Sequence, residues 1–192
     1  HSFYSGKAPS ILLVDSGDWY FSSQTAPYIE ALNTLNYSYD TWTVHNPYSD
    51  TPTLDILTPY DAVIWSSPQD SPGYLGVNDV ITDYLGLGGH LFISGQNVGA
   101  YDGGGIFTQL WWYRDFGAIY LGKTAVTETI SGSSDSFFSG LSFNLNDGSS
   151  SNNQIAPDVS TPRTNSFAQP AFAYKDGRSA GLTAGYCTPF RL

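Results

Sequence analysis

The chain has 192 residues, of which 41% are hydrophobic and 16% aromatic, so it is long enough for one packed domain and too apolar for a disordered segment. Seven Lys and Arg residues against 17 Asp and Glu give a net charge of −10, which argues against nucleic-acid binding and against an anionic membrane surface. No apolar run approaches the ~20 residues that a membrane-spanning helix needs.

Charged residues make up only 12% of the chain, about half of the usual share, and Ser, Thr, Asn, Gly and Tyr take their place. This composition is typical of extracellular bacterial proteins, so we expect a secreted protein. The sequence begins at His1 without a visible signal peptide, and its last residues, Pro189–Leu192, resemble the start of a strand. We therefore predict one domain over residues 1–192, truncated at its C-terminal end, with a core at 9–125 and an irregular β-rich extension at 126–192.

Strands and helices alternate in the first half of the chain. Residues 11–14 (ILLV) form a continuous apolar run, which is typical of a strand buried on both faces. Apolar residues at helical spacing predict a helix over 25–36, and the alternating stretch 37–44 (YSYDTWTV) predicts a second strand. Residues 46–59 contain three prolines and predict a loop.

The same pattern continues toward the middle of the chain. Residues 61–65 (DAVIW) predict a third strand, and the apolar spacing over 77–85 predicts a helix that Gly88-Gly89 ends. Residues 91–93 form a fourth buried strand, and 105–116 predict a third helix. Helical crossovers of this kind join parallel strands. We therefore expect an α/β fold, a three-layer, doubly wound and mainly parallel sheet of the flavodoxin-like type, with a loop-rich β tail.

The second half contains β formers between polar loops. Residues 118–130 are rich in β formers, whereas 131–136 and 146–153 are rich in Ser, Gly and Asn. The turn dipeptide Asp176-Gly177 predicts a hairpin over 171–184. No composition shift marks a second domain.

Polar side chains follow each of the four predicted parallel strands. In an open α/β sheet the carboxyl ends of the strands meet at one rim, which is where ligands bind. We expect the cleft there to be formed by the polar and aromatic residues that follow these strands: Asp15, Asp18, Trp19, His45, Gln69, Ser94, Gly95 and Gln96. The same residue types also cap helices and satisfy strand ends, which is the structural alternative for each of them.

Two chemical alternatives remain at this rim. Asp15 and Asp18 are close enough in sequence to share a hard cation such as calcium, although D-S-G-D lacks the further carboxylates of a known loop. Ser94, His45 and Asp15 are conceivable as a hydrolase triad, although Ser94 lacks the flanks of a G-x-S-x-G nucleophile elbow.

The remaining motifs carry less chemistry. Cys187 is the only cysteine and has no histidine after it, so we interpret it as a small, partly buried residue. The glycine-rich stretches at 86–89 and 103–105 match no nucleotide-binding motif, and we expect no cofactor.

The segments ILLVDSGDW, YDTWTV, YDAVIWSS, VITDYLGLGG and HLFISGQNVGAY, in this order, resemble the class I glutamine amidotransferase-like superfamily, which has a flavodoxin-like fold. In particular they resemble the amidotransferase-like modules of large secreted bacterial proteins, often found beside protease domains. The resemblance covers about residues 9–125 and continues more weakly through ISGSSDSFFSGLSF and the hairpin over 171–184.

The resemblance implies where a catalytic cysteine would lie. In catalytic members a helix that ends in Gly-Gly leads into a strand and then into a sharp turn, which carries the reactive thiol and aims nearby amides at the oxyanion. That position falls on Gly95, or on Ser94 after a shift by one, and the family's later histidine has no counterpart after His90.

We therefore expect a non-catalytic, extracellular accessory or interaction domain of a larger secreted protein, for example a protease. Its partners would be other domains of the parent polypeptide, and a small polar ligand or peptide would bind the cleft, with no nucleic acid and no membrane. The alternatives are the Ser94–His45–Asp15 hydrolase and a purely structural spacer.

Overall fold

The computed structural model describes residues 9–19, 22–68, 72, 77–104, 108–124, 129–145 and 157–185. In chain order its elements are β1 (Ile11–Asp15), α1 (Ala26–Thr34), β2 (Tyr39–Thr43), α2 (Leu54–Leu57), β3 (Ala62–Ser67), α3 (Asn78–Gly86), β4 (His90–Gly95), α4 (Val98–Asp102), the π-helical turn η2 (Trp111–Asp115), β5 (Ala118–Lys123), β6 (Thr129–Gly132), β7 (Ser142–Asn144), β8 (Asp158–Pro162), β9 (Gln169–Tyr174) and β10 (Ser179–Thr183).

A four-stranded parallel sheet forms the centre of the α/β part, in the order β2-β1-β3-β4. All five residues of β1 are buried because it lies between two strands and between two helical layers, as its unbroken apolar run predicted. This strand order is that of a flavodoxin-like doubly wound sheet, which confirms the expected fold class.

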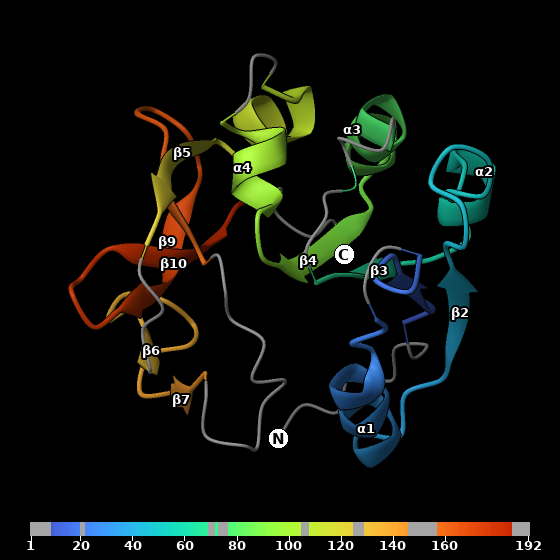
Figure 1. Ribbon diagram of the computed structural model, residues 1–192, viewed down its shortest axis with the longest axis horizontal. Helices are drawn as coiled ribbons and strands as arrows, with labels where there is room; N and C mark the ends of the chain where they lie inside the picture. Colours follow the sequence, from blue (N-terminus) through green and yellow to red (C-terminus); the bar gives the residue numbers. More distant parts are fainter. Residues whose placement is uncertain are drawn as a thin grey trace, which may run out of the picture.

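Helices cover both faces of this sheet (Figure 1). Helix α1 lies on one face, and α2 and α3 lie on the other. The larger part of the core is on the second side, where Val63 and Trp65 of β3 belong to the same buried cluster as Ile81 and Tyr84 of α3. Among the described residues, no helix is long and apolar enough to cross a membrane.

The end of α3 shows why Gly88 and Gly89 stand before β4. Gly88 has a φ of 91°, the left-handed conformation that closes helices, and Gly89 donates its backbone N–H to Tyr84 O at 3.0 Å. A Cβ atom on Gly89 would lie 2.3 Å from the ring of Tyr84. The glycine pair therefore ends the helix and lets the chain turn tightly into β4.

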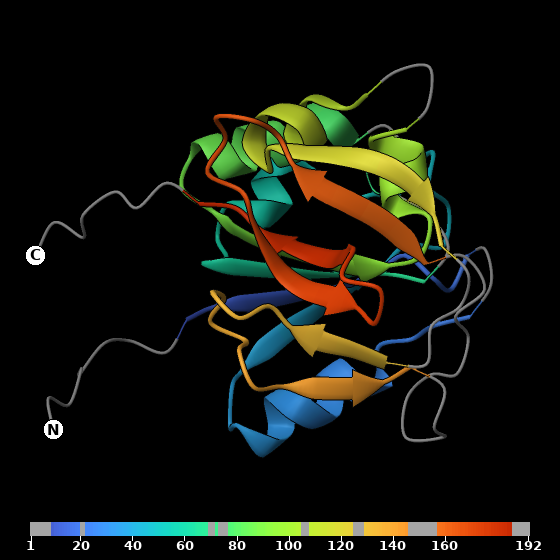
Figure 2. The same cartoon turned by 90° about the vertical axis from the view of Figure 1, so that its left-hand side faces the viewer.

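The β tail faces the β4 edge of the parallel sheet (Figures 1 and 2). It consists of the antiparallel pair β5-β8 and a second, antiparallel sheet in the order β10-β9-β6-β7, with β10 packed beside β8. The predicted hairpin is β9-β10, which confirms the reading of its turn dipeptide.

Two local predictions were wrong. Instead of a third helix over 105–116, the described part of that stretch holds only the short turn η2, in which Trp111 and Trp112 are buried. Helix α2 forms in the predicted loop over 46–59, and α4 forms in a segment for which the sequence predicted no element. Both helices are shorter than two turns, so they hold their shape through tertiary packing and leave no helical period in the sequence.

Candidate functional site

The centre of the rim, where β1 and β3 end, is filled by a buried hydrogen-bond cluster. Ser16 Oγ lies 3.0 Å from Ser67 Oγ and accepts a hydrogen bond from Trp65 Nε1 at 3.0 Å. The Ser16 backbone N–H donates to Ser66 O at 3.1 Å. Asp15 accepts a hydrogen bond from the Gly17 N–H at 3.0 Å, so its carboxylate caps its own turn. Asp15 therefore has the structural role of satisfying a backbone amide at the end of its strand.

The residues after β1 and β2 lie on one side of this filled centre. His45 Nδ1 is 3.4 Å from Asp18 Oδ2, and both side chains are exposed. Trp19 is partly buried and packs against the hydrophobic core. Among the described residues, no group of three or more His, Cys, Asp or Glu residues could hold a metal ion.

Ser94 and His45 lie at opposite edges of the parallel sheet, which corrects the expectation that one cleft brings a triad together. Strands β2 and β4 form opposite edges, with β1 and β3 between them. Three strand spacings of about 4.8 Å separate the two residues by roughly 14 Å, far beyond hydrogen-bonding reach. The structure therefore does not assemble Ser94, His45 and Asp15.

The turn after β4 is shaped by close contact with β3. A Cβ atom on Gly95 would lie 1.5 Å from Ser67 O, so no larger residue fits there without a shift of the backbone. The Gln96 N–H donates to Pro68 O at 3.1 Å, and Asn97 then takes a left-handed φ of 60° before α4 begins. None of the residues from Ser94 to Asn97 is a cysteine.

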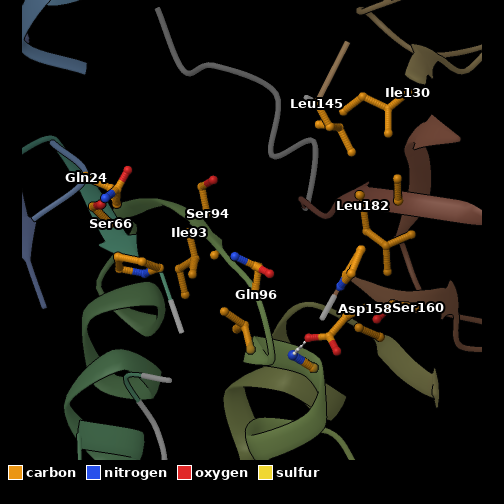
Figure 3. A pocket seen from close by; sticks show the side chains of 18 of the residues that line it. Gln24, Ser66, Ile93, Ser94, Gln96, Ile130, Leu145, Asp158, Ser160 and Leu182 are labelled. Atoms are coloured by element: carbon orange, nitrogen blue, oxygen red, sulfur yellow. Dashed lines mark hydrogen bonds between the residues drawn. The ribbon is translucent and has the colours of Figure 1, made fainter. Parts of the chain in front are cut away.

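A pocket of about 670 Å³ lies between this turn and the β tail, and we call it the corner pocket. In Figure 3, Ile93, Ser94 and Gln96 line one wall, and Ile130, Asp158 and Leu182 line the facing wall. The β tail therefore supplies half of the pocket, which is large enough for a small organic ligand.

Polar groups lie at the β4 wall of the corner pocket. Gln96 is only 3% exposed and lines the pocket, as does Ser94 at the end of β4. Burial raises the pKa of Tyr28, and a hydrogen bond with Ser94 partly opposes this effect. The Ser94 hydroxyl therefore has a tyrosine partner from α1 and no partner among the described histidines: His90 Nδ1 lies 2.9 Å from Asp61 O, at the amino end of the strand.

Asp158, the first residue of β8, joins the β tail to the turn after β4. Its Oδ2 accepts hydrogen bonds from the Gly99 N–H at 2.8 Å and from the Ala100 N–H at 3.4 Å, both in α4 (Figure 3 marks a bond at this point). Burial raises the pKa of Asp158 to about 6, although the two amides and the positive charge of Lys123 lower it.

The sequence did not predict that β8 and β10 form a wall of the corner pocket. Asp158 and Ser160 lie in a short D-V-S-T-P segment that follows a polar stretch, and no pattern in it indicates that the strand packs beside α4. Of the predicted site residues, Ser94, Gly95 and Gln96 line the corner pocket, whereas Gln69 lies outside the described residues, as Cys187 does.

Comparison with known proteins identifies solved structures with a similar fold. No protein-family model and no curated protein matches the chain. The solved structure of a protein assigned as a GMP synthase subunit from Thermoplasma acidophilum matches with a TM-score of 0.51 and 14% identity, covering 93% of this chain and 79% of its own. A ThuA-like protein from Bacteroides uniformis matches with the same score and identity, covering 91% and 71%.

Both matched proteins have class I glutamine amidotransferase-like folds. The present chain therefore has a fold of this kind, in agreement with the resemblance of its sequence segments. At 14% identity the likeness concerns the fold alone.

Proposed function

We propose that this chain is a non-catalytic, amidotransferase-like accessory domain of a larger secreted protein, and that it binds a small ligand or a partner segment in the corner pocket. The observation that carries the proposal is the position of Asp158. Its carboxylate accepts hydrogen bonds from the two backbone amides that follow the turn after β4.

A catalytic member of the superfamily would need a nucleophile at this turn and free donors for an oxyanion. Here the turn reads Ser94-Gly95-Gln96-Asn97, and a negative carboxylate already takes the donors of Gly99 and Ala100. An oxyanion formed beside that carboxylate would be repelled rather than stabilised. The arrangement therefore favours binding over acyl transfer.

The corner pocket supports the binding part of the proposal. It is lined by apolar side chains from both walls, among them Ile93, Trp112 and Leu182, with Gln96 and Ser160 as polar contacts. A few polar groups in a mostly apolar pocket of several hundred Å³ are typical of a small-molecule site. A purely structural spacer would have no need for such a pocket.

A serine-directed fluorophosphonate probe tests the non-catalytic part. Because no described histidine lies beside Ser94, we expect no labelling of the folded chain. Labelling that mass spectrometry assigns to Ser94, and that a Ser94→Ala variant loses, would overturn this part of the proposal.

Ligand-observed NMR with indole, tryptophol and p-cresol tests the binding part. Ala180, in β10, lines the pocket, whereas Thr183 in the same strand is exposed and lies outside its lining. We expect at least one probe to bind, Ala180→Trp to abolish binding by filling the pocket, and the matched control Thr183→Trp to leave it intact. Equal binding to both variants would place the ligand elsewhere and refute the proposal.

The secreted, multidomain part rests on composition and on the resemblance to modules of secreted proteins. Sequencing the gene on both sides of the segment tests it. We expect a leader sequence upstream and at least one further domain in the same reading frame. An open reading frame with neither would contradict this part.

A further inference from the structure

The corner pocket has one formal charge among its described lining residues, and it is negative. Asp158 is the only charged residue among them, and no Lys, Arg or His accompanies it. An anionic ligand would therefore find no counter-ion in this lining, and the net charge of −10 on the whole chain repels it further.

Aromatic side chains from both walls line the same pocket as this single carboxylate. The aromatic residues that line the pocket are Tyr28, Trp112, Phe116, Phe143 and Tyr174. Aromatic faces attract organic cations through the negative potential of the ring, and the attraction is stronger where water is excluded. Aromatic rings together with one carboxylate form a composition suited to an organic ammonium ion.

The two oxygens of Asp158 differ in their partners. Oδ2 accepts from the Gly99 and Ala100 amides, whereas Oδ1 is buried and has no hydrogen-bond partner among the described residues. An unpaired buried oxygen is costly, and because Asp158 lines the pocket, a small shift of its side chain would let an N–H donor from a ligand supply what Oδ1 lacks.

Among the described residues, no group near Asp158 supplies the missing hydrogen bond to Oδ1. Lys123 faces it across the β5-β8 ladder and lowers the pKa of its carboxyl, but Lys123 does not line the pocket. Tyr174 donates its hydroxyl to the Asp158 backbone O at 2.7 Å, and burial raises the pKa of Tyr174 to about 12. Tyr120 of β5 also lies near Asp158, and burial raises its pKa as well, so both phenols stay neutral at physiological pH.

We infer that the corner pocket binds a primary ammonium group carried on an apolar ring, with the Asp158 carboxylate as its counter-ion and the aromatic side chains around the ring. This inference rests on the proposed ligand-binding function and specifies the ligand class.

Calorimetric titration of the chain with three indoles tests the inference. Tryptamine carries the ammonium group, tryptophol replaces it by a hydroxyl, and indole-3-propionate by a carboxylate. At pH 8 we expect tryptamine to bind at least tenfold more tightly than tryptophol, because a desolvated charge pair is added, and indole-3-propionate not to bind.

The pH dependence gives a second readout that needs no variant. With a pKa of about 6, Asp158 is about one-tenth ionised at pH 5, whereas the amine stays protonated at both pH values. Tryptamine should therefore bind about tenfold more weakly at pH 5 than at pH 8, while the affinity for tryptophol stays constant.

The Asp158→Asn variant assigns the preference to one residue. We expect it to bind tryptamine no better than tryptophol, whereas the charge-matched control Asp135→Asn, at an exposed position outside the corner pocket, keeps the preference. To separate the amine of a peptide N-terminus from a free amine, Trp-Gly-Gly is compared with tryptamine. Binding of the peptide alone would overturn the assignment to a small amine.

The possible outcomes distinguish the preference for an amine from ligand binding itself. Equal binding of tryptamine and tryptophol, blocked by Ala180→Trp, would overturn the amine preference and leave the binding function standing. Binding of none of the three indoles, together with no binding of indole or p-cresol, would overturn both.

Discussion

Replacing Asp158 by Asn should change how the stability of the protein depends on pH. In the unfolded chain this carboxyl has a pKa near 3.8, and in the folded chain burial raises its pKa to about 6. Between these values the folded state holds a proton that the unfolded state has released, so the free energy of unfolding falls as pH rises. Asparagine is neutral at every pH and removes this dependence.

The expected size follows from the two pKa values. The difference between 3.8 and about 6 corresponds to about 3 kcal/mol, an upper value because the carboxyl remains partly accessible to solvent. The hydrogen bonds from Gly99 and Ala100 already contribute to this pKa, and in the variant they become bonds to a neutral amide oxygen whose strength does not change with pH. The free energy of unfolding of the variant, relative to the parent, should therefore rise by about 2–3 kcal/mol between pH 3.5 and pH 7.5.

Urea unfolding followed by tryptophan fluorescence measures this difference, because the chain has five Trp residues. Asp135→Asn, at an exposed position, gives the background effect of removing one negative charge. A difference between Asp158→Asn and the parent that stays flat across this pH range, or that falls with rising pH, would refute the burial of this carboxyl.

Further substitutions probe the packing around the turn after β4. Gly95→Ala should destabilise the fold by about 3 kcal/mol, or prevent folding, because its Cβ would meet Ser67 O at 1.5 Å. Gly86→Ala, at the end of α3 with open space around it, should leave the free energy of unfolding unchanged or raise it by up to about 1 kcal/mol. A loss comparable to that of Gly95→Ala would contradict the steric cause given for Gly95. Trp65→Phe removes the indole donor of Ser16 Oγ and should cost about 1–2 kcal/mol in urea unfolding; a neutral result would show that this bond adds nothing to the filled rim.

The fold could be predicted from the sequence because its signals are local. The apolar run Ile11–Val14 identifies a strand buried on both faces, and Gly88-Gly89 marks the end of a helix whose apolar spacing is regular. Both features are decided by residues that are neighbours in the chain, so sequence patterns record them.

The candidate site depends on distances between strands, which the sequence does not record. His45 and Ser94 both follow strands and were expected at one rim, but the strand order puts them at opposite edges. The buried serines around Ser16 fill the space between them, and no pattern in the sequence distinguishes a packed serine from one that faces a ligand.

The second wall of the corner pocket depends on pairing across a long stretch of sequence. Asp158 lies opposite Lys123 in the β5-β8 ladder, and its carboxylate contacts Gly99, 59 residues earlier in the chain. Tertiary packing alone decides such a contact, since the D-V-S-T-P segment has little intrinsic strand preference. Its place in the pocket was therefore visible only in the fold.

A crystal structure of the chain soaked with tryptophol tests the central claim most directly, namely that the turn after β4 and the β tail together form a binding pocket closed by Asp158. We expect the indole ring between Ile93 and Leu182, with the Asp158 carboxylate still on the Gly99 amide. An indole bound elsewhere, or an Asp158 side chain turned away from that amide, would contradict the account.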